Sequence, residues 1–255
     1  KEQIQIKSAL ISVFSKEGLD ELVTILNNHD VKIYSTGGTQ KYIENLGISV
    51  HPVEGITNYP SILGGRVKTL HPKIFGGILN RSSNKEDQSQ LEEYEIPQID
   101  LVVVDLYPFE ETVKSGLGEQ EIIEKIDIGG ISLIRAAAKN YSDVTVLSKK
   151  EHYKKLSKII LEKKAPSTNL QQRKYFATES FSVSSNYDTA IHDYFSSASN
   201  LPLRYGENPH QKGWFKGNLE EVFSQLHGKQ ISYNNLLDID AAIMLMEDFT
   251  NSPPT

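Results

Sequence analysis

The chain has 255 residues, 38% of them hydrophobic and 24% charged, and its formal net charge of −6 at pH 7 argues against nucleic acid as its main partner. No run approaches the ~18 apolar residues of a membrane span and no leader-like segment opens the chain, so we expect no membrane partner. The absence of cysteine excludes disulfides, thiol nucleophiles and cysteine-bound zinc, and it fits a cytoplasmic location.

The first fifty residues alternate between short apolar runs and helical periodicity. Residues 8–14, 31–36 and 48–53 are short, apolar and rich in branched side chains, as buried strands are. Between them, residues 16–30 carry Leu and Val at helical spacing, and residues 39–47 end on a glycine, which predicts two helices. This β-α-β-α-β order predicts a parallel sheet wrapped by helices.

The same alternation continues further along the chain. Strands are predicted at residues 100–108 and 143–148, and helices at residues 120–126, within 125–140 and at 150–160. The fold class expected is therefore α/β, with a doubly wound, mainly parallel sheet and flanking helices.

After residue 166 the pattern changes. Residues 168–197 contain no Gly, no Pro and no strand signal, which predicts one long helix or two abutting ones. Residues 197–213 are rich in Ser, Asn, Pro and Gly and predict a domain boundary. A further helix is expected at residues 238–250, followed by a Pro-Pro tail.

One stretch of this acidic chain is free of acids. No Asp or Glu occurs between Glu54 and Glu86, whereas Arg66, Lys68, Lys73, Arg81 and Lys85 all do. Such a window predicts a focused site for a small anion, and a solvated basic face explains it equally well from charge alone.

Two glycine-containing turns have the composition of anion sites. In residues 63–77 (LGGRVKTLHPKIFGG), an extended backbone would point Arg66 and Lys68 the same way, so that one phosphate could use both. We favour that reading over a solvated basic loop. In residues 35–39 (STGGT), helix-start amides and hydroxyls could bind an anion. The spacing of STGGT favours a plain turn in which Thr39 caps the next helix, because no known phosphate-loop motif is complete.

Two further segments place acids and cations at element ends. Asp105 and Tyr107 lie at the end of a predicted buried strand, at the edge where ligands bind in open α/β sheets, or else they cap and pack a turn. In KIDIGGISLIRAAAKN, Asp127 precedes a Gly-Gly pair, and Arg135 and Lys139 lie one helical turn apart. Dipole complementation at the two helix ends is the simpler explanation of Asp127 and Lys139 alone. Taken together, these motifs favour one phosphate-bearing ligand.

Six stretches match one known family in order: SVFSKEGL, STGGTQK, LGGRVKTLHPKIFGGIL, DLYPFEETV, EKIDIGGISLIRAAAKN and LRYGENPHQ. They resemble the bifunctional purine-biosynthesis proteins with AICAR transformylase and IMP cyclohydrolase activities. The resemblance implies an IMP cyclohydrolase domain of methylglyoxal-synthase-like fold over residues 1–197. It implies a linker and the truncated start of the transformylase domain over residues 198–255.

This resemblance also implies an activity and its partners. The expected reaction is ring closure of formyl-AICAR to IMP with loss of water, which needs no metal and no cofactor. The full-length transformylase would use 10-formyltetrahydrofolate, and its activity is not expected from this chain. A homodimer is the expected assembly.

The same matching implies site residues. The catalytic set is Lys68, Tyr107, Asp127 and Lys139. As a hypothesis for their roles, we expect Lys139 to donate and accept protons, Asp127 to orient Lys139 or the carboxamide, and Lys68 and Tyr107 to stabilise the oxygen of the tetrahedral adduct. The implied nucleotide contacts are Ser12, Lys16, Thr36, Gly37, Gly38, Arg66, Thr69, Asp105, Ile128 and Gly129. The implied AICAR contacts of the incomplete transformylase site are Arg204 and Tyr205.

The chain departs from the family pattern at two places near these residues. Phe14-Ser15 stands where Ser-Asp is common, and Asp105 stands where Asn is frequent. Two other readings stay open, a methylglyoxal-synthase-like lyase and a non-catalytic module that senses a nucleotide or phosphate. Such lyases lack the GGRVKTLHP segment, and a sensor would tolerate Lys139→Arg.

Overall fold

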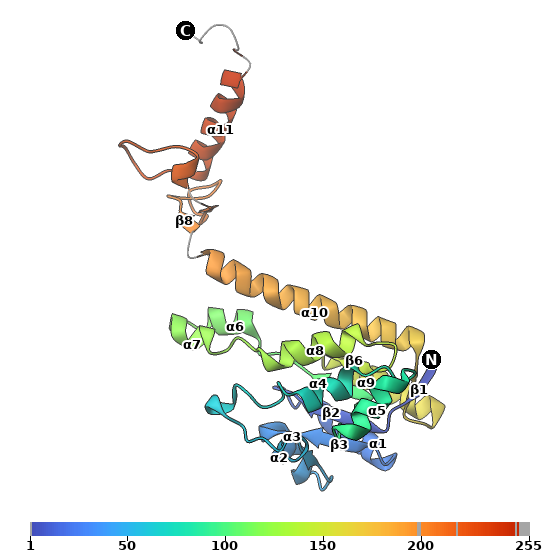
Figure 1. Cartoon of the computed structure of the whole chain (residues 1–255). Coiled ribbons are helices and arrows are strands. Elements are labelled where there is room, and N and C mark those ends of the chain that lie inside the picture. Colours follow the sequence, from blue (N-terminus) through green and yellow to red (C-terminus); the bar gives the residue numbers. More distant parts are fainter. Residues whose placement is uncertain (1, 198–199, 218, 248, 250–255) are drawn as a thin grey trace. The chain divides into compact units, whose positions relative to one another are not determined.

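A computed structural model describes residues 2–197, 200–217, 219–247 and 249 (Figure 1). The chain divides into two compact units, Lys1–Asp188 and Thr189–Thr255, and each is described here by itself. No helix of the described residues is both long and apolar enough to span a membrane.

The first unit is built on a five-stranded parallel sheet with the strand order β4-β3-β2-β5-β6. Its strands are β2 (Ser8–Ser12), β3 (Lys32–Ser35), β4 (His51–Pro52), β5 (Leu101–Val104) and β6 (Thr145–Leu147). All four residues of β5 are buried, because the central strands of a parallel sheet are covered on both faces. The predicted α/β fold with a mainly parallel sheet is confirmed.

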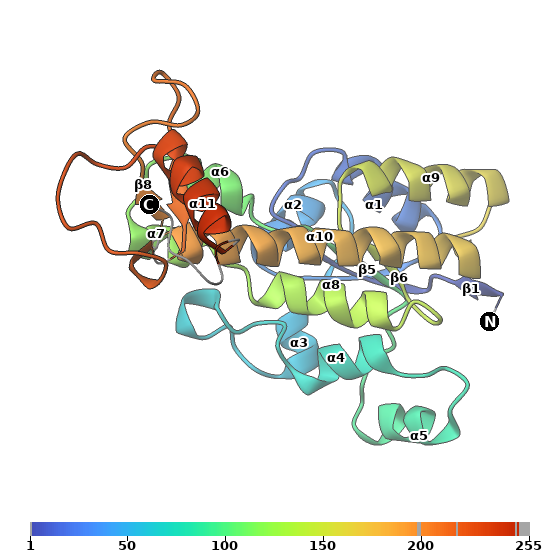
Figure 2. The ribbon, with the colours of Figure 1, turned by 90° about the horizontal axis from the view of Figure 1, so that it is seen from above.

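Helices cover both faces of this sheet (Figure 2). Helices α1 (Leu19–Asn28) and α9 (Glu151–Lys163) pack together on one face, and α4 (Pro72–Leu79) and α8 (Gly129–Lys139) pack together on the other. Helix α2 (Gly37–Asn45) follows β3 and contacts β2 and β3. Helices α1 and α9 bury their apolar stripes against the sheet, as the periodicity of residues 16–30 and 150–160 predicts.

The long helix predicted after residue 166 is one continuous helix, α10 (Leu170–Ser197). It runs along the β6 side of the sheet (Figure 2), where the hydroxyls of Ser148 and Ser180 lie 2.8 Å apart. The expectation that no strand begins this region is wrong at its first residues. There β7 (Ser167–Asn169) pairs antiparallel with β1 (Gln3–Gln5).

Several short helices were not predicted, because fewer than three turns give little periodicity. They are α3 (Val53–Thr57), η1 (Leu63–Gly65), α4, α5 (Lys85–Glu93) and α6 (Phe109–Lys114). At the start of α4, Pro72 occupies the first turn and His71 Nδ1 accepts the Lys73 N–H. Helix α7 (Glu119–Ile123) begins and ends earlier than predicted.

The second unit contains a small hairpin, a short turn of helix and one longer helix. These are β8 (Asn200–Pro202) paired antiparallel with β9 (Trp214–Lys216), η2 (Leu219–Glu221) and α11 (Tyr233–Glu247). Its buried core consists of Leu203, Leu219 and Ile231. Helix α11 begins five residues before the predicted start, and residue 250 and the Pro-Pro tail lie outside the described residues.

Candidate functional site

The candidate site lies where β2 and β5 end side by side. The chain leaves these two neighbouring strands toward opposite faces of the sheet, which is the arrangement that opens a ligand crevice in doubly wound folds. Asp105 directly follows β5, and its carboxylate accepts the backbone N–H groups of Phe14 and Ser15, the latter at 2.9 Å. Burial raises the pKa of Asp105, while these N–H bonds and the nearby Lys16 oppose the rise.

Lys16 follows the end of β2 and turns back onto it. Its ammonium donates to the carbonyl oxygens of Val13 and Phe14, the second at 3.0 Å. Burial lowers the pKa of Lys16, and Asp105 opposes that change. The two departures from the family pattern thus meet in one place, since Asp105 binds the backbone of Phe14 and Ser15.

The STGGT turn connects β3 to α2 at the same edge of the sheet. Thr39 does not cap α2, contrary to the plain-turn reading. Its hydroxyl donates to the Val13 carbonyl at 2.9 Å and accepts the Val13 N–H at 3.1 Å. Thr36 donates to the Glu54 carboxylate at 2.8 Å, and no side chain caps the first amides of α2. These amides, including Gly37 and Gly38, are the kind of donors that bind a phosphate.

Lys68 lies against this turn. A Cβ atom added at Gly37 would lie 3.5 Å from the Lys68 ammonium nitrogen, and one at Gly65 would lie 2.8 Å from Lys68 Cε. Both glycines have positive φ, at +57° and +90°. The next residue, Thr69, reaches the start of α8, because a Cβ at Gly129 would lie 3.4 Å from its hydroxyl oxygen. Lys68 therefore contacts the start of α2, and Thr69 contacts the start of α8.

Asp127 stands at the start of α8. Its Oδ1 accepts the Gly130 N–H at 2.6 Å, and its own N–H donates to the Tyr187 hydroxyl at 2.8 Å. Burial raises the pKa of Asp127, the Gly130 N–H bond opposes this, and the charge of Asp105 adds to it. Asp105 and Asp127 are thus two half-buried carboxylates with raised pKa values, and the charge of one raises the pKa of the other. Such clusters are typical of functional sites.

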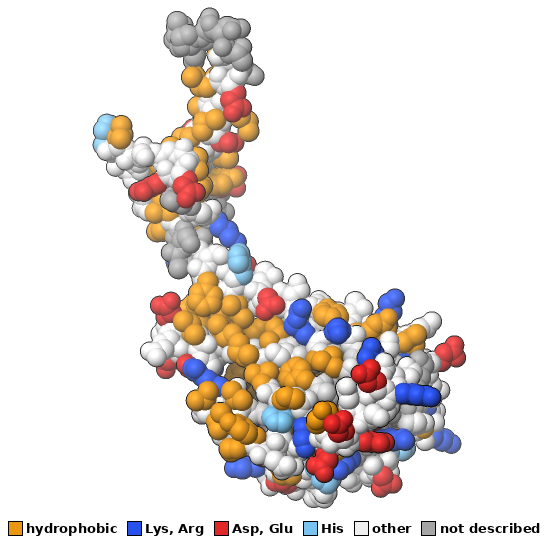
Figure 3. All heavy atoms as spheres, in the orientation of Figure 1, with side chains coloured by type: hydrophobic (Ala, Val, Ile, Leu, Met, Phe, Trp, Pro, Cys, Tyr) orange, Lys and Arg blue, Asp and Glu red, His pale blue; other side chains and the backbone are white. Residues whose placement is uncertain are grey.

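Apolar side chains surround this end of the first unit. Figure 3 shows hydrophobic side chains gathered over α6, α7 and the loop before α4. Leu63 and Ile128 are well exposed, and Tyr107 is 37% exposed. The Tyr107 ring packs on the Phe14 ring at a centroid distance of 4.4 Å, and the Lys125 ammonium lies 5.3 Å from the Tyr107 ring centroid. Such a surface offers stacking and apolar contact to a planar base.

Of two further predicted cations, Arg66 pairs with an acid three residues before Asp127, and Lys139 lies at the other end of α8. Arg66 forms an ion pair with Glu124 and its side chain is 65% exposed. Lys139 is the last residue of α8 and is exposed, about 15 Å along the helix axis from Gly129. Arg135 donates to the Ser184 hydroxyl at 3.2 Å, so it faces α10.

The two AICAR contacts implied for the second unit touch each other. Arg204 donates to the Tyr205 hydroxyl at 2.9 Å, and its guanidinium lies 4.8 Å from the Tyr205 ring centroid. Hydrogen bonds from Ser232 and Arg204 lower the pKa of Tyr205.

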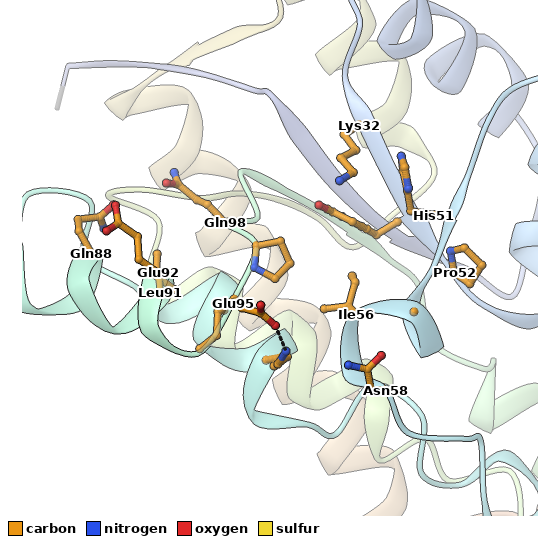
Figure 4. Close-up of a pocket in the computed structure, with 15 residues that line it drawn as sticks. Lys32, His51, Pro52, Ile56, Asn58, Gln88, Leu91, Glu92, Glu95 and Gln98 are labelled. Atoms are coloured by element: carbon orange, nitrogen blue, oxygen red, sulfur yellow. Dashed lines mark ion pairs between the residues drawn. The ribbon is translucent and has the colours of Figure 1, made fainter.

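A separate hollow of about 680 Å³ lies beside the β3–β4 edge, between α3 and α5 (Figure 4). Lys32, His51 and Glu95 line it, and Lys73 forms an ion pair with Glu95 at 3.8 Å. None of the predicted site residues lines this hollow. In the described part of the chain, His, Asp and Glu do not gather into a group of three that could hold a metal ion.

The parallel sheet, its strand order and the helices on both of its faces define the first unit as an α/β domain of the MGS-like class. A family model for the MGS-like domain matches residues 18–132, and one for the AICARFT/IMPCHase bienzyme matches residues 137–254. The chain belongs to the family of the bifunctional purine biosynthesis proteins.

Three relatives of this family carry the same name, bifunctional purine biosynthesis protein PurH. The protein of Bacteroides thetaiotaomicron is 57% identical over 97% of this chain and 51% of its own length. Those of Aquifex aeolicus and Bacillus subtilis are 45% and 41% identical over 95% and 96% of this chain, and over 51% and 52% of their own lengths. The chain thus spans about half the length of the curated relatives it matches.

A solved structure described as the crystal structure of ForH resembles the fold with a TM-score of 0.63 and 30% sequence identity. The match covers 74% of this chain and 97% of the ForH chain. Because it takes in nearly the whole of that chain, ForH shares the architecture described above for most of the residues of this one.

Proposed function

We propose that the first unit is an IMP cyclohydrolase, which closes the ring of formyl-AICAR to give IMP as the last step of purine synthesis. The observation that carries this proposal is a cluster of charged side chains at two helix starts. Lys68 lies at the start of α2, Asp127 lies at the start of α8, and the charge of Asp105 acts on Asp127. Membership of the bifunctional purine biosynthesis family supports it.

The proposed chemistry needs placement and proton transfer. The carboxamide nitrogen bonds to the formyl carbon and loses a proton as the formyl oxygen gains one. The resulting hydroxyl then leaves as water, taking the proton of the formamido nitrogen. A C=N bond forms between that nitrogen and the former formyl carbon. Because both reacting groups belong to one molecule, holding them in contact supplies much of the rate enhancement. We assign Asp127 to take the proton from the attacking nitrogen, since its raised pKa brings it closer to neutral pH.

In this proposal the phosphate of the ribotide binds at the start of α2. The uncapped amides of Gly37 and Gly38 and the adjacent Lys68 ammonium offer partial and full positive charge together. The base would then extend toward Tyr107, Ile128 and Asp127, with Asp105 accepting from a ribose or base donor. The hypothesised roles of Lys68 at the adduct oxygen and of Lys139 in proton transfer remain predictions.

We assign no transformylase activity to these 255 residues. All side chains of α11 are at least partly exposed. No step proposed here uses 10-formyltetrahydrofolate. We also propose a homodimer and a cytoplasmic location for the protein, and sedimentation of the purified chain would test the first.

The decisive experiment measures IMP formation by absorbance. The purified chain is mixed with formyl-AICAR, without folate or added metal, and IMP formation is followed. We expect turnover by the wild type and its loss in Asp127→Asn. Binding of IMP without turnover would favour a sensing module, and phosphate release from a triose phosphate would favour a methylglyoxal-synthase-like lyase.

A further inference from the structure

One buried hydroxyl holds the segment that carries Asp127. Tyr187 of α10 is 8% exposed, and its ring packs edge-on against Phe109 at a centroid distance of 6.1 Å. Its hydroxyl accepts the Asp127 N–H at 2.8 Å and lies 3.4 Å from the Lys125 carbonyl, to which it donates. The Tyr187 hydroxyl thus hydrogen-bonds to the backbone at both ends of residues 125–127, about 60 residues earlier in the chain.

That segment presents two groups of the candidate site. The Asp127 carboxylate faces the start of α8 through its bond to Gly130, and the Lys125 ammonium lies over the Tyr107 ring. No side chain at Ile128, where α8 is capped, adds a hydrogen bond. The direction of the Asp127 carboxylate therefore depends on the Gly130 N–H at one end and on the Tyr187 hydroxyl at the other.

We propose that Tyr187 is a positioning residue for ring closure, which fixes the backbone of Asp127 so that its carboxylate meets the substrate. The inference rests on the proposed cyclohydrolase function. Burial raises the pKa of Tyr187, so the phenol stays protonated near neutral pH and can accept from one backbone group while donating to the other. A misplacement of about 1 Å in a reacting group can reduce the rate by up to ~100-fold.

The test removes the hydroxyl and keeps the ring. Tyr187→Phe retains the packing on Phe109, and Tyr175→Phe on the same helix is the matched control. Tyr175 lies twelve residues earlier, about 18 Å along α10, and its ring contacts His152 and Phe176. Turnover of formyl-AICAR, amide hydrogen exchange at Asp127 and the melting temperature are measured for each variant.

We expect Tyr187→Phe to lower kcat by roughly 10-fold or more, with KM changed less than about twofold. The Asp127 amide should exchange at least ~10-fold faster, because it loses its bonding partner. In an Asp127→Asn background, Tyr187→Phe should slow the residual rate by less than about twofold, since both changes act through one group. Tyr175→Phe should alter none of these readouts.

Two results would overturn the inference. One is a wild-type kcat in Tyr187→Phe, and the other is a reduced kcat with unchanged exchange of the Asp127 amide. If the wild type itself forms no IMP, the proposed function fails instead. The exchange comparison would still show whether Tyr187 holds Asp127.

Discussion

Asp127 and Gly130 approach each other so closely that position 130 has no room for a side chain. The Gly130 N–H donates to Asp127 Oδ1 at 2.6 Å, and a Cβ at residue 130 would lie 2.6 Å from Oδ2. No real Cβ contact is that short, so any other residue must displace the carboxylate. Glycine is needed here for space, since its φ lies outside the left-handed region.

Gly130→Ala should therefore separate activity from stability. Alanine in a helix is favoured over glycine by about 1 kcal/mol, so α8 should remain folded. The displaced carboxylate should lower turnover of formyl-AICAR by roughly 10-fold or more. Gly55→Ala in α3 is the matched control, because a Cβ at that position meets nothing within 4 Å. Full activity in Gly130→Ala would contradict the placement of Asp127 at the reacting centre.

Lys68 and Lys139 are expected to differ in ligand binding. Lys68→Met should weaken IMP binding by roughly 10-fold or more, because its ammonium lies beside Gly37, where we propose that the phosphate binds. Lys139→Ala should leave IMP affinity within about twofold, because Lys139 lies about 15 Å from Gly129. Calorimetric titration with IMP measures both.

Turnover of the same two variants decides their roles. Loss of turnover in Lys139→Ala with intact IMP binding would support its hypothesised proton-transfer role, and full turnover would remove Lys139 from the catalytic set. A Lys68→Met variant that binds IMP normally but turns over slowly would move Lys68 from the phosphate to the adduct oxygen.

Asp127→Asn should lose most of its turnover and yet be more stable than the wild type at neutral pH. The folded pKa of Asp127 is raised, so its ionisation opposes folding. The stability it contributes is present below the unfolded pKa of about 3.9 and is lost as pH rises through the folded pKa. The gain in melting temperature should therefore shrink as pH falls toward 4. Asp238→Asn on exposed α11 is the control for simple removal of charge. A gain that persists unchanged at pH 4 would refute the argument.

Much of the fold was predictable because it follows from long apolar runs. Residues 100–108 and 143–148 are apolar enough to place β5 and β6, and the glycine-free run after residue 168 gives α10. The short helices α3 and α6 escaped prediction because one or two turns show no period, and their ends are fixed by packing.

The candidate site was predictable only where its residues belong to a local motif. Lys68 and Asp127 stand in glycine-containing segments whose composition points to close approach. Tyr187 gave no signal, since its partner is 60 residues away and a buried tyrosine on a helix is ordinary. The periodicity predicts that Lys139 lies on a helix, whereas the length of α8, which carries Lys139 away from Gly129, comes only from the structure.

His152 should make the stability of the first unit depend on pH below neutrality. This α9 residue is 3% exposed, its Nδ1 has no hydrogen-bond partner, and the rings of Tyr175 and Phe176 pack against it. Burial lowers its pKa and the charge of Lys149 adds to this, while Glu179 and Glu151 oppose it and Lys155 adds weakly.

The folded state therefore favours the neutral form of His152. Its contribution to the free energy of unfolding is present above the unfolded pKa of about 6.5 and is lost as pH falls through the folded pKa. In His152→Phe, the urea midpoint should fall less between pH 7.5 and pH 5 than in the wild type. The exposed His227→Gln variant should follow the wild-type curve. Equal pH dependence in His152→Phe and the wild type would show that His152 does not titrate on unfolding in this range.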